Sequence, residues 1–333
     1  MGGGHMKAYL VYHREEAVKN QGFLNLFREA GGECGMDFSY VPYDAYKQRE
    51  LPDFVLNRTR DREVSRWYEE RRVPVFHSSF LTEIGNHKGK TLAFLRGRLP
   101  EKILRTKWAP ETLAVSKERL AQWQSVLAAG DLEALHEVRR FQEEGEPFVM
   151  KSVDGHGGSE VLSFVPFSGA DSGITLQQYC LDFNRRLGVL FGKDCLLQEM
   201  VSGSGRDIRV YVVGNRIYQA MLRQGQGDFR SNASLGGRAG AYSLSESEKE
   251  YIGQFLQAFE GEVLGLAGLD FIIADDGRLI FNELEEMAGC RMIYQNTGRD
   301  IVRDYVMWLR DCPQITGRVN KIHLAEMEDS NGI

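Results

Sequence analysis

Residues 270–286 read DFIIADDGRLIFNELEE, and this stretch decides the fold more than any other. Two apolar runs, Leu269–Ile273 and Leu279–Leu284, flank the pair Asp276-Gly277. Asp-Gly between alternating apolar residues is typical of a two-residue hairpin turn. The pattern therefore predicts an antiparallel β-hairpin in the last third of the chain.

The register of this hairpin predicts a cluster of carboxylates. A two-residue loop sets Asp270 directly opposite Glu283. Because side chains alternate along a strand, Glu285 shares the face of Glu283, while Asn282 and Leu284 point the other way. Opposed like charges repel, so we expect at least one raised carboxyl pKa without a cation, and Mg²⁺ would relieve the repulsion. The alternative is a solvated acidic hairpin.

A glycine-rich segment lies upstream of the hairpin. The strand-like run Phe148–Lys151 leads into residues 154–159, DGHGGS, and Val161–Val165 returns as a second strand. Glycines let the backbone approach phosphate oxygens closely, and Lys151 adds a positive charge there. No Gly-Lys-Ser/Thr closes the loop, so it is not a Walker A loop. A tight turn without a ligand is the alternative, with His156 as an exposed loop histidine.

Basic residues lie between the glycine segment and the hairpin. Ile208–Val213 and Arg216–Leu222 flank the turn signal Gly214-Asn215, which predicts a second hairpin. Asp207 and Arg209 share a face of its first strand, and Arg223 ends the second. Arginine recognises carboxylates and phosphates with two parallel hydrogen bonds. Several arginines near carboxylates favour a phosphoryl-transfer site, with surface ion pairs as the alternative.

The first part of the chain has a different pattern. Ala8–Tyr12, Phe54–Asn57 and Val73–Phe76 are strand-like, and Gln21–Ala30 and Glu63–Arg71 have helical spacing between them. This alternation predicts a small α/β domain with a largely parallel sheet. Residues 116–141 have many charges at helical spacing and predict an amphipathic pair of helices. The fold class is therefore α+β with antiparallel sheets, preceded by a small α/β domain.

Composition limits the possible functions. The chain of 333 residues is 42% hydrophobic and 26% charged, with a net charge of −6, which argues against general binding to nucleic acids or membranes. Its five cysteines are scattered and form no CxxC pair, so we expect a cytoplasmic protein without a disulfide framework or zinc site. Residues 1–5, MGGGH, are interpreted as a tag remnant, with no signal peptide after Met6 and no apolar run long enough to span a bilayer.

Together these segments resemble the ATP-grasp superfamily, and within it the RimK-like amino-acid ligases. Residues 86–91, NHKGKT, are similar to the family's Asn-Asp-Lys-x-x-Thr, and Gln198–Val201 is similar to its adenine hinge. Asp207-Ile208-Arg209 is similar to the Asp-Ile-Arg strand, and residues 229–237 are similar to Phe-Arg-x-Asn…Gly-Gly. The resemblance covers roughly residues 86–301.

The resemblance implies a role for each matching position. The residues implied to bind ATP are Lys88, Lys151, Gly155, His156, Gly157, Gly158, Gln198, Glu199, Met200, Val201 and Asp207. One or two Mg²⁺ ions, or Mn²⁺ in their place, would be held by Asp270, Glu283 and Glu285. The implied catalytic residues are Arg230, Asn232 and Arg209, and the implied substrate residues are Arg223, Arg291 and Asn57.

The implied organisation is an N-terminal domain (6–85), two ATP-grasp subdomains (86–198 and 199–323) and a tail (324–333). The implied reaction activates a carboxylate as an acyl phosphate and joins it to an amine, each on a small molecule or peptide. A phosphotransferase and a non-catalytic ATP-binding protein remain alternatives, and a homo-oligomer is left open. Glu285 departs from the family's usual asparagine, and Arg291 follows a segment that lacks the usual proline.

Overall fold

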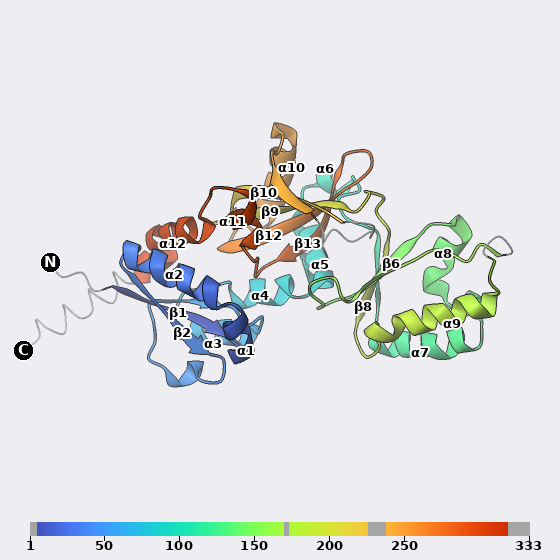
Figure 1. Ribbon diagram of the computed structural model, residues 1–333, viewed down its shortest axis with the longest axis horizontal. Coiled ribbons are helices and arrows are strands. Elements are labelled where there is room, and N and C mark those ends of the chain that lie inside the picture. Colours follow the sequence, from blue (N-terminus) through green and yellow to red (C-terminus); the bar gives the residue numbers. More distant parts are fainter. Residues whose placement is uncertain (1–4, 170–172, 226–237, 319–333) are drawn as a thin grey trace, which may run out of the picture.

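The computed structural model describes residues 5–169, 173–225 and 238–318. The described residues form three sheets, which lie one after another along the molecule (Figure 1). The N-terminal sheet lies at one end, a four-stranded sheet with its own helices lies at the other, and a five-stranded sheet lies between them. This arrangement confirms the predicted α+β class with an α/β leader.

The N-terminal sheet is parallel, with the strand order β2-β1-β3-β4. Its elements are β1 (Met6–Tyr12), α1 (Arg14–Lys19), α2 (Gln21–Cys34), β2 (Met36–Pro42), β3 (Phe54–Asn57), α3 (Arg62–Glu69) and β4 (Val75–Phe76). The sequence pattern predicted each of these except α1 and β2. Strand β2 is an edge strand with alternating buried and exposed residues, so it has no continuous apolar run.

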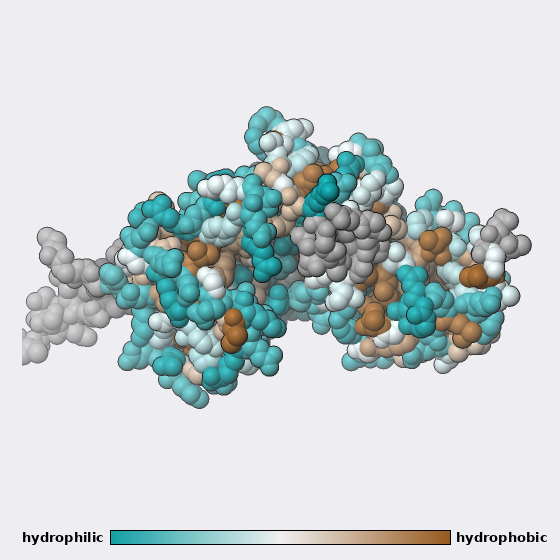
Figure 2. Space-filling view, in the orientation of Figure 1, coloured by the Kyte–Doolittle hydropathy of each residue, from teal (hydrophilic) through white to brown (hydrophobic). Residues whose placement is uncertain are grey.

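The distal four-stranded sheet is antiparallel, with the order β5-β8-β6-β7. Its elements are β5 (Thr112–Val115), α7 (Lys117–Ala128), α8 (His136–Glu144), β6 (Phe148–Ser152), β7 (Val161–Phe164), α9 (Leu176–Leu187) and β8 (Cys195–Glu199). Trp123, Phe148 and Phe183 are buried in the core between this sheet and its helices. Figure 2 shows apolar side chains on the surface of this lobe, where Leu181 of α9 and Val189 are exposed.

The five-stranded sheet is antiparallel, with the order β11-β10-β9-β12-β13. Its strands are β9 (Arg206–Val213), β10 (Arg216–Gln224), β11 (Arg238–Tyr242), β12 (Leu266–Ile273) and β13 (Leu279–Glu285). The helices around it are α4 (Ser79–Gly85), α5 (Lys88–Arg98), α6 (Glu101–Leu104) and α10 (Glu246–Ala258). Leu92 and Leu95 of α5 pack in the same core as Ile208 and Phe255.

The two ends of the chain share one core. Helices α11 (Arg291–Asn296) and α12 (Ile301–Asp311) follow β13 and pack against the N-terminal domain, where Phe27 and Tyr305 meet edge to face. The helices of residues 88–104 pack on the five-stranded sheet, although the predicted boundary at residue 86 groups them with the distal sheet. The domain boundaries therefore remain predictions. Two of the hydrophobic cores contain residues from both sides of a predicted boundary.

The hairpin of β12 and β13 pairs Asp270 with Glu283 as predicted, but by a different route. Near the turn, Phe271 pairs with Phe281, whereas a two-residue loop would pair it with Asn282. A β-bulge that inserts Asn282 then restores the predicted pairing. The prediction that Asn282 points away from Glu283 was wrong, because the extra residue lets both side chains line the same cavity.

Candidate active site

A cavity of about 1140 Å³ lies where the three sheets meet. The distal sheet lines it with Val149, Lys151 and Gln198, and the five-stranded sheet lines it with Arg209 and Glu283. The N-terminal domain contributes another wall, which includes Arg58. A cavity of this size, lined by polar residues from several segments, is suited to a sizeable polar ligand.

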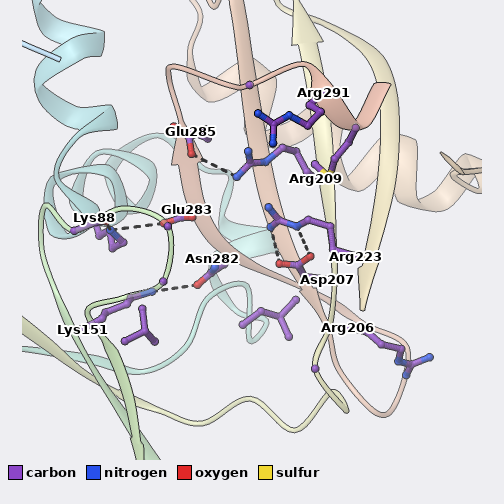
Figure 3. Close-up of a pocket in the computed structure, with 18 of the residues that line it drawn as sticks. Lys88, Lys151, Arg206, Asp207, Arg209, Arg223, Asn282, Glu283, Glu285 and Arg291 are labelled. Carbon is purple, nitrogen blue, oxygen red and sulfur yellow. Dashed lines mark hydrogen bonds and ion pairs between the residues drawn. The ribbon is translucent and has the colours of Figure 1, made fainter. Parts of the chain in front are cut away.

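Two lysines from separate segments converge on β13 (Figure 3). Lys88 begins helix α5, and its Nζ lies 3.7 Å from Glu283 Oε2. Lys151 lies in β6, and its Nζ donates to Asn282 Oδ1 at 3.1 Å. Burial lowers the pKa of Lys151 to about 8, with Lys88 adding to the effect and Glu283 opposing it. Both predicted phosphate-binding lysines therefore face one cavity.

The glycine segment borders the cavity beside these lysines. Gly155, Gly157 and Gly158 line the cavity, and Gly155 accepts a hydrogen bond from Lys88 Nζ through its carbonyl oxygen. Gly157 and Gly158 have φ values of +68° and +79°, a region that favours glycine. His156 is exposed and does not line the cavity, as the alternative reading of this loop expected.

The predicted hinge, Gln198–Val201, also lines the cavity. Gln198 donates from Nε2 to Thr112 Oγ1 at 2.7 Å, and Glu199 pairs with Lys107 at 2.8 Å. These side-chain contacts hold the end of β8 in place. The segment from 198 to 201 therefore forms part of the cavity wall, and its assignment as the adenine hinge stays a prediction.

Contrary to the prediction, Asp270 does not line the cavity together with Glu283 and Glu285. Its side chain is fully buried, and Arg209 binds it with two hydrogen bonds of 2.8 and 2.7 Å. Arg223 donates to the same carboxylate at 2.7 Å and to both oxygens of Asp207. Burial alone would raise the pKa of Asp270, but the two arginines outweigh it and lower the pKa. At Asp270 the two arginines therefore replace the expected repulsion between carboxylates, and the pKa is lowered where the prediction had at least one carboxyl pKa raised.

Glu283 and Glu285 remain available at the cavity wall. Glu285 lies 3.5 Å from Arg209 Nη2, and both glutamates are partly exposed. Among the described residues, no group of three or more His, Cys, Asp or Glu side chains is arranged to hold a metal. However, Mg²⁺ is commonly held by one or two carboxylates together with substrate phosphates. Glu283 and Glu285 fit that donor set, while Asp270 is engaged by arginines.

The predicted substrate residues have different positions. Arg223 and Arg291 line the cavity, whereas Asn57 is buried and does not. Asn57 donates from Nδ2 to Asp61 O and Ser65 Oγ, so its amide shapes the loop after β3. Its assignment to substrate was wrong, because the carboxamide is used inside the N-terminal domain.

Arg58, the next residue, lines the cavity instead. The carboxyl ends of strands in a parallel sheet commonly face ligands, and β3 ends at residue 57. From the sequence, this rule could have indicated Arg58 as a residue at the cavity, because Arg58 directly follows β3. The predicted catalytic residues Arg230 and Asn232 lie outside the described residues.

The three sheets and the cavity between them form an ATP-grasp fold. The crystal structure of D-cycloserine synthetase DcsG is similar with a TM-score of 0.61, at 14% identity over 91% of this chain and 99% of that one. D-alanyl-alanine synthetase A from Vibrio cholerae has a TM-score of 0.61, at 12% identity over 95% of this chain and 99% of that one. At these identities the likeness concerns the fold alone.

A family model described as the RimK-like ATP-grasp domain matches residues 112–309, more than half of the chain. The chain belongs to this family. Ribosomal protein bS6–L-glutamate ligase of Escherichia fergusonii is 34% identical over 167 residues, which cover 50% of this chain and 51% of that protein. The match thus spans about half the length of this relative. None of the helices in the described ranges has the length and apolar character of a membrane span.

Proposed function

We propose that this chain is an ATP-dependent ligase that activates a carboxylate as an acyl phosphate and joins it to an amine. The observation that carries the proposal is the convergence of Lys88 and Lys151 on Asn282 and Glu283, inside one cavity of a RimK-like ATP-grasp chain. Two lysines beside a glycine segment suit the phosphates of a nucleotide. The residues 198–201 would receive the adenine at the other side of the cavity.

The nucleotide would bring the metal with it. Glu283 and Glu285 would hold Mg²⁺ together with phosphate oxygens, and the ion would supply charge neutralisation. Without a ligand, Lys88 Nζ lies 3.7 Å from Glu283 Oε2. On binding, Lys88 would contact a phosphate and Glu283 would contact the metal, so each charge would exchange one opposite charge for another. Asp270 would serve chiefly to hold Arg209 and Arg223 in position.

The reaction needs no covalent nucleophile from the protein. An oxygen of the substrate carboxylate attacks the γ-phosphorus of ATP, and ADP leaves. The amine nitrogen then attacks the acyl carbon, inorganic phosphate leaves, and the nitrogen loses a proton. Positioning and fixed positive charge provide most of the catalysis in such transfers. Arg209 and Arg291 at the cavity, and Arg230 outside the described residues, are the proposed sources of that charge.

The experiment is a screen for amine-dependent ADP release, with the product identified by mass spectrometry. Because a relative is named an L-glutamate ligase, glutamate is the first amine to test, with short acidic peptides as acids. We expect a product lighter than the sum of acid and amine by one water. A phosphorylated end product would instead support a phosphotransferase. Failure to bind Mg-ATP at all would remove the proposal.

A further inference from the structure

Three glutamates lie at and just after the end of β13, and one of them turns away from the cavity. Glu283 and Glu285 line the cavity, with side chains that are 27% and 22% exposed. Glu286, the next residue, does not line it, and its side chain is only 1% exposed. A buried carboxylate is costly unless other groups satisfy it. The partners of Glu286 therefore indicate its role.

Glu286 contacts two segments that lie far from it in the sequence. Its Oε2 lies 3.1 Å from Nδ1 of His77, which directly follows β4 of the N-terminal domain. Its Oε1 accepts a hydrogen bond of 2.9 Å from Nδ2 of Asn86, in the short link between α4 and α5. The other ring nitrogen of His77, Nε2, is buried without a partner among the described residues. Within the described chain, Glu286 is therefore the hydrogen-bond partner of this imidazole.

Helix α4 leaves room for the Glu286 side chain. Gly85 ends α4, and a Cβ added there would lie 2.7 Å from Cβ and 2.8 Å from Cγ of Glu286. These distances are far shorter than the ~3.5–4.0 Å of a normal contact between carbon atoms. Because this position is a glycine, the end of α4 can lie directly against the residue that follows β13. Close packing and hydrogen bonds thus join the same two segments.

Asn86 connects Glu286 to a lysine of the cavity. Lys88 lies two residues after Asn86 and begins α5. On the other side, Glu286 directly follows Glu285. Figure 1 shows α4 and α5 beside β13, and Figure 3 shows Lys88 facing Glu283, with Nζ 3.7 Å from Oε2. The segments that Glu286 joins therefore carry the charges that meet at the cavity wall.

We propose that Glu286 is a positioning residue, which holds Lys88 at a fixed place relative to Glu283 and Glu285. The inference rests on the proposed ligase function, in which Lys88 contacts a phosphate and the two glutamates hold Mg²⁺. One Mg-nucleotide must meet all three side chains at once, so a change in their relative position weakens the metal contact. Altering groups that orient metal ligands commonly changes metal affinity by about 10- to 100-fold.

The effect of Mg²⁺ on ADP affinity tests this role. ADP is titrated by calorimetry into the intact protein with saturating Mg²⁺ and with EDTA, and the magnesium effect is the ratio of the two dissociation constants. Glu286→Met retains the length of the side chain but not the carboxylate, and we expect it to lower the magnesium effect by roughly five- to tenfold. ADP affinity in EDTA should change little, because the N–H of Lys88 still donates to the carbonyl oxygen of Val153 beside the glycine segment. A loss of stability alone would leave the ratio unchanged.

Three further variants separate positioning from stability. Glu286→Gln keeps an oxygen for Asn86 and should restore most of the magnesium effect. Gly85→Ala keeps every polar group, but its new methyl group must displace Glu286, so it should also lower the magnesium effect. Glu83→Met is the matched control, because Glu83 of α4 pairs with Lys90 of α5 and does not line the cavity. Its magnesium effect should equal that of the wild type.

A magnesium effect of wild-type size in Glu286→Met overturns the positioning role and leaves the ligase proposal standing. An equal loss in Glu83→Met does the same, because the effect would then not depend on contact with β13. If Glu286→Met does not fold, Gly85→Ala decides by the same measure. A wild type that binds no Mg-ADP removes the ligase proposal itself. A wild type with equal ADP affinity in Mg²⁺ and in EDTA overturns the metal assignment and with it the role of Glu286.

Discussion

Asp270 is buried between two arginines, and its contribution to stability follows from that position. Removing its charge leaves Arg209 with only the 3.5 Å contact to Glu285 and leaves Arg223 with only Asp207. Breaking a buried ion pair from one side typically costs about 3–5 kcal/mol. We expect Asp270→Asn to lower the free energy of unfolding by that amount, measured by urea denaturation without nucleotide. Repulsion between opposed carboxylates would instead predict a variant at least as stable as the wild type.

Glu283→Gln is the control for Asp270→Asn. The Glu283 side chain is partly exposed and lies 3.7 Å from Lys88, so its loss should cost no more than about 1 kcal/mol. If the two variants unfold at the same urea concentration, the buried arginine network does not stabilise the fold as proposed.

Lys151 should make nucleotide binding depend on pH. Burial places its pKa near 8, below the ordinary 10.5, so the side chain loses its proton as the pH rises through 8. Phosphate favours the protonated amine. ADP affinity should therefore fall by about tenfold between pH 7 and pH 9, with proton uptake on binding near pH 8.

Calorimetry in two buffers of different ionisation enthalpy measures this proton uptake. Lys151→Arg keeps the charge throughout this range, so it should flatten the pH dependence. A wild-type affinity that stays constant from pH 7 to pH 9 would contradict a phosphate contact by Lys151.

The turn between β9 and β10 shows how an element depends on a distant helix. Gly214 and Asn215 have φ values of +58° and +60°, as the predicted two-residue turn requires. A Cβ added at Gly214 would overlap the indole ring of Trp308 in α12, whereas one at Gly277, with φ of +84°, would meet nothing within 4 Å. Both positions disfavour alanine, but only Gly214 is also sterically enclosed.

We therefore expect different costs for the same substitution at these two turns. Gly277→Ala should destabilise the protein by about 1–2 kcal/mol through backbone strain alone. Gly214→Ala should cost an additional ~1–3 kcal/mol, because the turn or α12 must shift. Thermal unfolding of both variants gives the comparison, and equal melting temperatures would show that Trp308 moves aside freely.

The cavity joins all three sheets, so nucleotide binding should stabilise the molecule as a whole. A ligand that binds only the folded state raises its stability by mass action. Lys88→Met should weaken Mg-ATP binding by more than tenfold, or ~1.4 kcal/mol, and reduce the thermal shift accordingly.

Lys90→Met is the matched control, because Lys90 is two residues away on the same helix and pairs with Glu83 outside the cavity. Its ATP affinity should equal that of the wild type. Similar losses in both variants would indicate an effect of general positive charge on α5 and would argue against a specific phosphate contact.

Local sequence patterns predicted many of the helices and strands and two lysines of the cavity wall. Apolar alternation and the Asp-Gly and Gly-Asn turns predicted both hairpins, because strand period and turn conformation depend on neighbouring residues. Lys151 was singled out because it leads into the glycine segment, and Lys88 because residues 86–91 resemble a short motif of the family. Each of these signals lies within a few residues of the chain.

The tertiary structure alone decided the partners of the charged groups. Asp270 meets Arg209 of the adjacent strand β9 and Arg223 of β10, one strand further away. Asn57 turns into its own domain, and Arg58 lines the cavity. The bulge at Asn282 likewise depends on how β13 pairs with β12. Charge pairing and burial depend on which distant segments pack together, so residue spacing in one sequence does not specify them.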